Sequence, residues 1–273
     1  MQQLMNIFQI ALVQPLTNGL ILFYNLLFQN MGLAIIGFSL FLRYITNPLT
    51  KPYMNSMKKI KEIEPLVAKL KKKYANDPKK LMQAQTELYR QKKINPGSGC
   101  LPYLLQIVIL IALFNVFTQV LSQNGDTLTK LNQMLYAPLK FSENSTLNTS
   151  FLYLDVRKPD IFKFANIPFP IPGPLLILAG LLQFFSAKMM APVVRAEQKI
   201  AKKTMGEADD IAASMQSSMI YMFPVMTIIF GVNFPSGLAL YWLLFSVFQI
   251  YQQYKTSGWG GLTPLIQKLG LLK

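Results

Sequence analysis

The sequence has no histidine and a single cysteine, Cys100. Ser-His-Asp and Cys-His catalysis both need histidine as a base, so these nucleophilic mechanisms are excluded. One cysteine without histidine also provides no zinc or iron–sulfur ligand set, and it can form no internal disulfide. The phosphate-cradling pattern GxxxxGK(S/T) is missing as well. We therefore expect no catalytic residue, no metal and no cofactor.

Acidic residues are also scarce, with 12 Asp and Glu against 27 Lys and Arg. Only 14% of the residues are charged, whereas about 25% is usual for soluble domains. Hydrophobic residues make up 52% of the chain, and they stand in long blocks without an acid. This composition predicts a basic membrane protein.

Five apolar segments without Asp or Glu are candidate membrane spans, each close to the roughly 20 residues that a spanning helix needs. They cover residues 30–50, 101–121, 174–192, 215–232 and 236–254. Glycine and proline between Gly231 and Gly237 predict a tight hairpin between the last two. The fold class that follows is an all-α membrane protein with a five-span helical core, which we assign to residues 30–254.

The distribution of basic residues orients these spans. The loops 51–99 and 192–214, Lys188 and the tail 255–273 together hold 21 of the 27 Lys and Arg. By the positive-inside rule, that side faces the cytoplasm. The N-terminus is then outside, the C-terminal tail is cytoplasmic, and the near-neutral loop 122–173 is outside.

Residues 1–29 are apolar and carry no charge. Pro15, Asn18 and Gly19 interrupt the run, and we interpret Leu16–Phe28 as an amphipathic helix on the extracytoplasmic surface. The alternative is a sixth span, which would spoil the odd number of spans that the orientation requires.

The loop 51–99 is too long for a plain connection. Apolar residues at three- and four-residue spacing predict a first helix, and they are Ile60, Ile63, Leu66, Val67, Leu70 and Tyr74. Asp77 can cap a second helix with Pro78 at its first position, and Asn95-Pro96-Gly97 should end it. Pro65 should kink the first helix or mark its true start. The expected structure is a cytoplasmic two-helix hairpin, called the arm below.

The arm carries a set of lysines that are candidate contacts for clients, the ribosome or lipid: Lys58, Lys59, Lys71, Lys72 and Lys73. One interpretation is a solvated face that enforces topology, and the other is contact with anionic lipids or ribosomal RNA. Both remain open. Few aromatic residues are interleaved with the lysines, which argues against sequence-specific reading of nucleic acid, and we expect no DNA partner.

Arg43 lies inside the first apolar segment, where insertion of an arginine costs roughly 2.5–3.5 kcal/mol. Snorkelling to the cytoplasmic interface is one explanation. The other is a hydrated site for a negative group, because no span carries an acid to neutralise Arg43. Its expected companions are neutral and polar: Thr46, Asn47, Gln106, Asn115, Gln183, Ser186 and Thr227. Gln106 and Gln183 could equally hold neighbouring helices together, and Tyr241 and Trp242 would ordinarily belong to an interfacial aromatic belt.

Several motifs resemble those of the YidC/Oxa/Alb membrane protein insertases. They are Leu42-Arg43 with Asn47-Pro48-Leu49-Thr50, the stretch from Asn95 to Pro102 with Leu104-Leu105-Gln106, Leu152-Tyr153-Leu154-Asp155 with Lys158-Pro159-Asp160, Phe234 to Trp242, and Gln252-Gln253. They occur in the family's order between about Gln14 and Tyr254. The chain resembles a short bacterial form, without a large periplasmic domain or a lipobox cysteine.

The resemblance implies a hydrophilic groove that is open to the cytoplasm and to lipid. Arg43 would make this groove positive, Gln183 and Trp242 match other groove positions, and Gln106 is a weaker match. The arm would receive clients, and a cytoplasmic tail would assist ribosome contact, although the tail here has three basic residues.

The function that we expect is insertion of nascent membrane proteins into a bacterial inner membrane, without nucleotide hydrolysis. The insertase would act alone or with the Sec translocon. The alternatives are a small anion transporter or channel that uses Arg43, and a non-catalytic chaperone that works only beside the Sec translocon.

Overall fold

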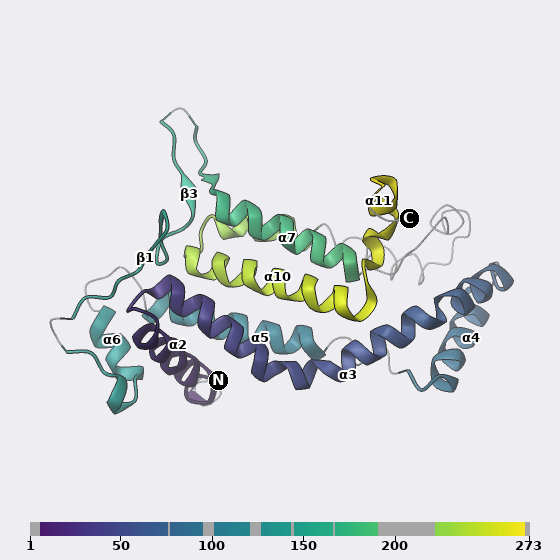
Figure 1. The fold of residues 1–273 in the computed structure, drawn as a ribbon, viewed down its shortest axis with the longest axis horizontal. Helices are drawn as coiled ribbons and strands as arrows, with labels where there is room; N and C mark the ends of the chain where they lie inside the picture. The colour runs from purple at the N-terminus through teal and green to yellow at the C-terminus, as the bar shows by residue number, and fades with distance from the viewer. Residues whose placement is uncertain are drawn as a thin grey trace. The chain divides into compact units, whose positions relative to one another are not determined.

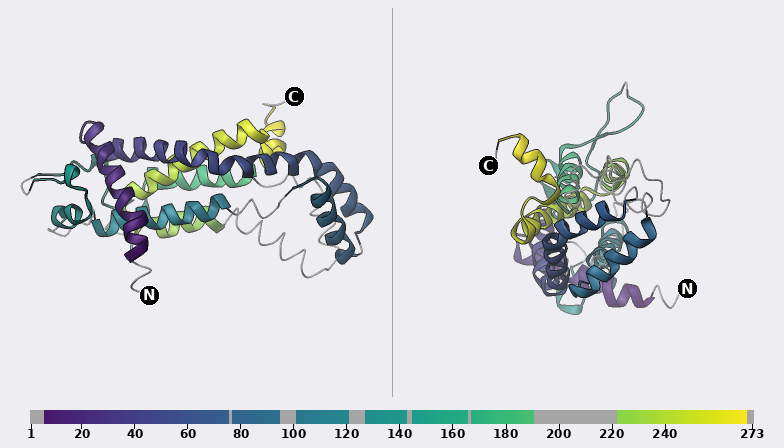
Figure 2. Two further views of the ribbon diagram at one scale, coloured as in Figure 1. Left: turned by 90° about the horizontal axis from the view of Figure 1, so that it is seen from below. Right: turned by 90° about the vertical axis from the view of Figure 1, so that its right-hand side faces the viewer.

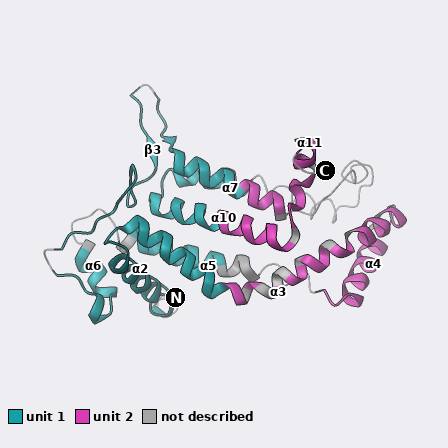
Figure 3. Ribbon diagram, viewed as in Figure 1, with its two compact units in different colours: residues 1–46, 104–183, 225–246 teal, residues 47–103, 184–224, 247–273 magenta. Residues whose placement is uncertain are grey.

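The computed structural model describes residues 6–75, 77–94, 101–120, 127–142, 145–165, 167–190 and 222–270. Helices dominate these ranges, where strands form two short antiparallel pairs (Figure 1). The prediction of an all-α protein is therefore confirmed. The chain forms two compact units (Figure 3). The first contains residues 1–46, 104–183 and 225–246, and the second contains residues 47–103, 184–224 and 247–273.

The N-terminal helix of the first unit is α2 (Gln14–Leu26), which follows a π-helical turn, η1 (Gln9–Val13). Together, Asn6–Leu26 form a helix long and apolar enough to cross a membrane. Within the unit, however, α2 runs across the direction of the helix that follows it (Figure 2). The prediction of a surface helix stays a prediction.

The next helix, α3 (Met31–Lys73), is 43 residues long and joins the first predicted span to the arm without a break. Pro48, Pro52 and Pro65 all lie inside it. Each proline removes one backbone hydrogen bond, yet the helix continues. The idea that Pro65 marks the start of the arm helix is therefore wrong, because α3 begins more than thirty residues earlier.

Described helices overlap each of the other predicted spans. They are α5 (Leu101–Asn115), continued by η3 (Val116–Val120), α7 (Pro174–Met190), a helix at Met222–Gly231, and α10 (Ser236–Ser257). The helix break between Gly231 and Ser236 falls at the predicted turn, and the tight hairpin of two spans stays a prediction. Residues 121, 191–192 and 215–221 of the predicted spans lie outside the described residues.

The loop between α5 and α7 carries the short elements of the first unit. They are α6 (Thr127–Met134), η4 (Ala137–Leu139), β1 (Ser150–Phe151) paired with β2 (Leu154–Asp155), and β3 (Ile161–Phe162) paired with β4 (Ile171–Pro172). In the pairs, Phe151 faces Leu154, and Phe162 faces Ile171.

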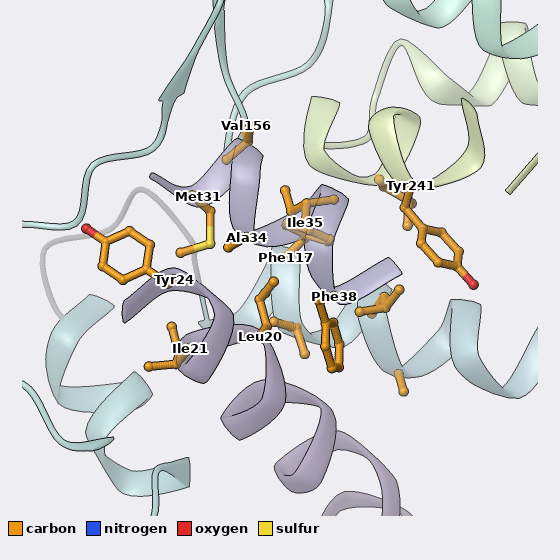
Figure 4. Close-up of a cluster of buried hydrophobic side chains, with 14 of the residues drawn as sticks. Leu20, Ile21, Tyr24, Met31, Ala34, Ile35, Phe38, Phe117, Val156 and Tyr241 are labelled. Carbon is orange, nitrogen blue, oxygen red and sulfur yellow. The ribbon is translucent and has the colours of Figure 1, made fainter. Parts of the chain in front are cut away.

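The core of the first unit forms where α2, α3, α5 and α10 meet (Figure 4). Leu20, Met31 and Phe117 are almost fully buried there. Gly237, at the start of α10, allows close packing, since a Cβ at this position would lie 2.5 Å from Cε1 of Phe117. A residue with a side chain would have to displace the ring, so glycine fixes how closely α10 approaches η3.

The second unit contains the arm. Helix α4 (Pro78–Gln91) begins as predicted, with the Asp77 carboxylate accepting a hydrogen bond from the Lys80 backbone N–H at 3.0 Å. This bond holds the pKa of Asp77 below its usual value. The helix ends four residues before Asn95, which itself lies outside the described residues.

The C-terminal part of the second unit contains η5 (Gly260–Leu262) and α11 (Thr263–Lys268). Gly260 has a φ of +49°, a conformation that glycine adopts without strain. A Cβ on Gly260 would collide with the carbonyl oxygen of Met189. The chain after α10 therefore packs directly on the end of α7.

Candidate functional site

Arg43 lies on α3 in the first unit and is partly buried. Its guanidinium carbon stands 3.9 Å from the centroid of the Phe245 ring, and Nη2 donates a hydrogen bond to the Phe245 carbonyl oxygen at 3.4 Å. A cation over an aromatic face is stabilised by about 0.5–2 kcal/mol, depending on its exposure to water. Phe245 therefore positions the guanidinium without neutralising its charge.

A second polar contact joins α5 to α10 beside Arg43. Gln106 Nε2 donates to the Tyr241 hydroxyl at 3.0 Å, and Tyr241 is close enough to Arg43 to interact with it electrostatically. The Tyr241 and Phe245 rings lie 6.4 Å apart, one helical turn from each other. The Gln106 hydrogen bond thus supports the interpretation in which an amide holds two helices together. This hydrogen bond lies near Arg43.

Tyr241 corrects the expectation of an interfacial belt, because its side chain is buried rather than exposed at a surface. The Gln106 amide satisfies its hydroxyl inside the unit. The sequence carried one signal for this arrangement, since Tyr241 and Phe245 are four residues apart and so share one face of α10.

Trp242 and Gln183 also belong to the first unit. Trp242 is half-buried and packs edge-on against Phe234, with ring centroids 6.2 Å apart. The Oε1 atom of Gln183 is buried and has no hydrogen-bond partner among the described residues. A buried amide oxygen that lacks a hydrogen-bond partner costs about 1–3 kcal/mol.

Two of the polar companions predicted for Arg43 make hydrogen bonds within their own helices. Thr46 Oγ1 donates to the Leu42 carbonyl oxygen at 2.8 Å, and Asn115 Nδ2 donates to the Ile111 carbonyl oxygen at 2.8 Å, each within its own helix. Ser186 and Thr227 are buried. The sequence thus identified polar residues of these spans but missed Phe245.

A separate polar cluster in the second unit joins two of the sequence motifs. Gln252 Nε2 donates to Asn47 Oδ1 at 3.4 Å and to Thr50 Oγ1 at 3.3 Å. The neighbouring Gln253 is buried. The amide of Gln252 therefore links α10 to α3 at the level where the lysine-rich part of α3 begins.

The lysines singled out in the arm all lie on the C-terminal half of α3. Four of them are exposed, namely Lys58, Lys59, Lys72 and Lys73, whereas the side chain of Lys71 lies outside the described residues. Lys73 Nζ stands 5.3 Å from the Tyr74 ring centroid. Exposed ammonium groups fit both a solvated face and a surface for anionic partners, so both interpretations remain and the contact role stays a prediction.

The motif at residues 152–160 has a structural role that the sequence did not reveal. The buried Asp160 carboxylate accepts hydrogen bonds from the Leu176 backbone N–H at 2.9 Å and from the Tyr153 hydroxyl at 3.2 Å. Leu176 lies in the first turn of α7, where backbone N–H groups lack helical partners. Asp160 therefore ties the loop 122–173 to the start of α7.

The same loop holds the start of α10. The backbone N–H groups of Ser236 and Gly237 donate to the carbonyl oxygens of Lys158 and Val156, at 2.7 and 2.9 Å. Asp155 is fixed nearby by Arg157 at 3.1 Å. Partial burial raises the pKa of Asp155, but hydrogen bonds from Arg157 and Thr149, together with the charge of Arg157, outweigh it and leave that pKa below its usual value.

The family model for the 60Kd inner membrane protein matches residues 22–259, which include every element of the site around Arg43. The chain belongs to this family. This family comprises the YidC/Oxa/Alb insertases that the sequence motifs resemble. The predicted family membership is therefore confirmed.

Similar proteins bear the name membrane protein insertase YidC. One from Fusobacterium nucleatum is 33% identical over 82% of this chain and 85% of its own length. One from Chlorobaculum parvum is 33% identical over 89% of this chain, and one from Chloroherpeton thalassium is 30% identical over 94%. The chain spans 35% and 37% of those two longer proteins.

Family membership supports the insertase function that the sequence predicted and does not favour the anion transporter. The motif at Asn95–Cys100 lies outside the described residues, whereas the motifs around Arg43, Asp160, Gly237 and Gln252 are all described. Two of these motifs position helix ends, and the other two link α3 to α10.

Proposed function

We propose that this chain is a membrane protein insertase that moves nascent hydrophobic segments from the cytoplasm into the bilayer through a positively charged hydrophilic groove. The observation that carries the proposal is the position of Arg43. Its guanidinium rests on the Phe245 ring inside an apolar, acid-free helical segment. A positive charge held in this way attracts a negative group that arrives and leaves.

The groove would be lined by Arg43, Gln183 and Trp242, with Gln106 at its edge. The open acceptor of Gln183 supports a hydrated lining, and the Gln106–Tyr241 pair supports a wall that keeps its shape. A polar or acidic tail of a client would enter from the cytoplasm, move toward Arg43, and release the hydrophobic segment into lipid.

Burial of the client's apolar surface would supply the driving force, at about 25 cal/mol per Å². The membrane potential adds about 2.3 kcal/mol per charge at 100 mV for an acidic tail. Neither source needs a nucleotide, a cofactor or a catalytic residue. The protein would lower the barrier for moving the polar tail.

The arm is proposed to capture clients and to meet the ribosome or anionic lipid head groups. Its exposed lysines support this role, and they are Lys58, Lys59, Lys72 and Lys73. Phosphate groups bind such clusters electrostatically, and Lys71 would add to them. The protein would work alone or with the Sec translocon.

The proposed location is the bacterial inner membrane, with residues 1–29 outside and the tail 255–273 in the cytoplasm. The position of α2 supports the outer placement of the N-terminus. Asn18 Nδ2 donates to the Met134 carbonyl oxygen, and Asn18 Oδ1 accepts from the Tyr136 backbone N–H. Both partners belong to the loop that the positive-inside rule places outside.

The test compares Arg43→Glu with Lys188→Glu, which makes the same charge change near the cytoplasmic end of another proposed span. Two clients that differ only in having acidic or neutral tails are expressed in cells depleted of their own insertase. Two unit charges 4 Å apart interact by about 1 kcal/mol in water and by about 4 kcal/mol at an effective dielectric constant of 20. Arg43→Glu should therefore reduce insertion of the acidic client by about five-fold or more.

The neutral client should be affected less by Arg43→Glu, and Lys188→Glu should leave the difference between the clients unchanged. Arg43→Lys keeps the charge and should retain most insertion. An equal loss of both clients in Arg43→Glu would refute the electrostatic step.

A further inference from the structure

The hairpin formed by β3, β4 and the loop between them exposes large apolar side chains. Phe162, Phe164 and Phe169 are 46%, 56% and 65% exposed. Residues 161–172 contain no acid and one base, Lys163. Clustered exposed apolar residues on a protein surface usually mark a contact site, and none of the roles described above uses these three.

The hairpin is firmly attached to the start of α7. Strand pairing closes its base, where Ile161 faces Pro172. The Gly173 backbone N–H donates to the Asp160 carbonyl oxygen at 2.8 Å, and the Asp160 carboxylate holds the first turn of α7. These contacts place the hairpin at the level where the apolar helix begins.

The direction of the hairpin is the second observation. It extends sideways, across the axis of the first turns of α7, in both Figure 1 and the right-hand view of Figure 2. Where α7 crosses a membrane, a hairpin attached in this way runs along the membrane surface and does not rise into water.

We propose that this hairpin is a membrane-dipping anchor whose phenylalanine side chains insert into the outer leaflet beside α7. Phenylalanine and a flanking lysine suit the boundary between acyl chains and phosphate groups, and the lack of acids avoids repulsion from anionic lipids. The anchor would hold α7 at a fixed depth while clients pass.

The proposal rests on the membrane-spanning orientation of α7, which is part of the proposed function, so the test must separate the two. In a Cys100→Ser background, single cysteines replace Phe164, Phe169, Thr146 or Leu178, and each carries a nitroxide spin label. Thr146 is an exposed polar residue of the same outer loop, and Leu178 is an exposed apolar residue within α7.

The purified full chain is placed in liposomes of phosphatidylethanolamine and phosphatidylglycerol. Collision rates are measured with oxygen, which concentrates in lipid, and with a water-soluble nickel chelate. Labels at 164 and 169 should collide more often with oxygen than with the chelate, as the label at 178 does, whereas the label at 146 should show the reverse. Because all four replaced side chains are exposed, folding should be little affected.

If labels at 164 and 169 behave like that at 146 while 178 is lipid-exposed, the anchor is refuted and the spanning α7 is retained. If 178 is also exposed to the chelate, the spanning orientation itself fails. The labels at 164 and 169 could be exposed to water in liposomes while cysteines at the same positions are protected from a maleimide in native membranes. This result would assign the hairpin to a protein partner and overturn the proposal.

Discussion

Replacing Asp160 with alanine should destabilise the first unit strongly. The carboxylate is buried and accepts from the Leu176 N–H and the Tyr153 hydroxyl. A hydrogen bond to a charged group contributes roughly 1.5–3 kcal/mol, and a negative charge at a helix N-terminus adds about 0.3–1 kcal/mol. The Tyr153 bond is longer and its ring is half-exposed, so we expect a total loss of about 3 kcal/mol.

Asp160→Asn removes the negative charge but keeps the shape of the side chain, so it separates the two contributions to stability. The amide oxygen can still accept from Leu176, so about half of the loss should remain. Tyr153→Phe removes the hydroxyl, which also accepts from the Leu175 N–H at 3.0 Å, and should cost about 1 kcal/mol. Because Tyr153 and Asp160 are in contact, the double variant should lose less than the sum of the two single losses.

The assay is equilibrium unfolding of the purified protein in mild detergent, followed by the fluorescence of its two tryptophans. Linear extrapolation of the denaturant dependence gives the free energy of unfolding. If Asp160→Ala stays within about 0.5 kcal/mol of wild type, as ordinary surface substitutions do, the capping role of Asp160 is refuted.

Three further predictions follow from the packing and the arm. Gly237→Ala should cost about 1–3 kcal/mol by forcing the Phe117 ring aside, and Phe117→Leu should recover part of that loss in the same unfolding assay; unchanged stability would contradict the close packing. The capping of α4 by Asp77 should be complete above the ordinary carboxyl pKa and be lost as the pH falls through its lowered pKa. The protection factors of the first α4 amides, which correct for the intrinsic pH dependence of hydrogen exchange, should therefore fall in acid, whereas Asp77→Asn should remove this change. Deleting residues 54–93 should reduce client capture, measured by crosslinking, while a protease-protection pattern shows the spans intact; full capture without the arm would refute its role.

The sequence predicted the helices well because each span is a long apolar block and each end carries a local signal. Asp77 and Pro78 were sufficient to place the start of α4, since both act within one helical turn. The sequence could not predict that α3 continues from Met31 to Lys73. The stretch contains three prolines, which ordinarily favour breaks, and only the packing of the whole helix determines that it continues.

The site was predicted in part. Arg43 was found because a charge in an apolar segment is costly and therefore conspicuous. Phe245 was missed because it is one of 19 phenylalanines, and nothing local distinguishes it. Asp160 was quoted as part of a motif, yet its partner Leu176 is 16 residues away, and such pairings depend on the tertiary fold.

The role of the Arg43 charge in insertion can be isolated in liposomes that contain only the purified protein. A radiolabelled single-span client with a short acidic tail is synthesised beside them, and protease protection reports insertion. We expect a protected fragment of spanning length with wild type and with Arg43→Lys, and much less of it with Arg43→Glu. Insertion by the Arg43→Glu protein that equals wild type would contradict the claim that the charge of Arg43 draws the client tail into the membrane.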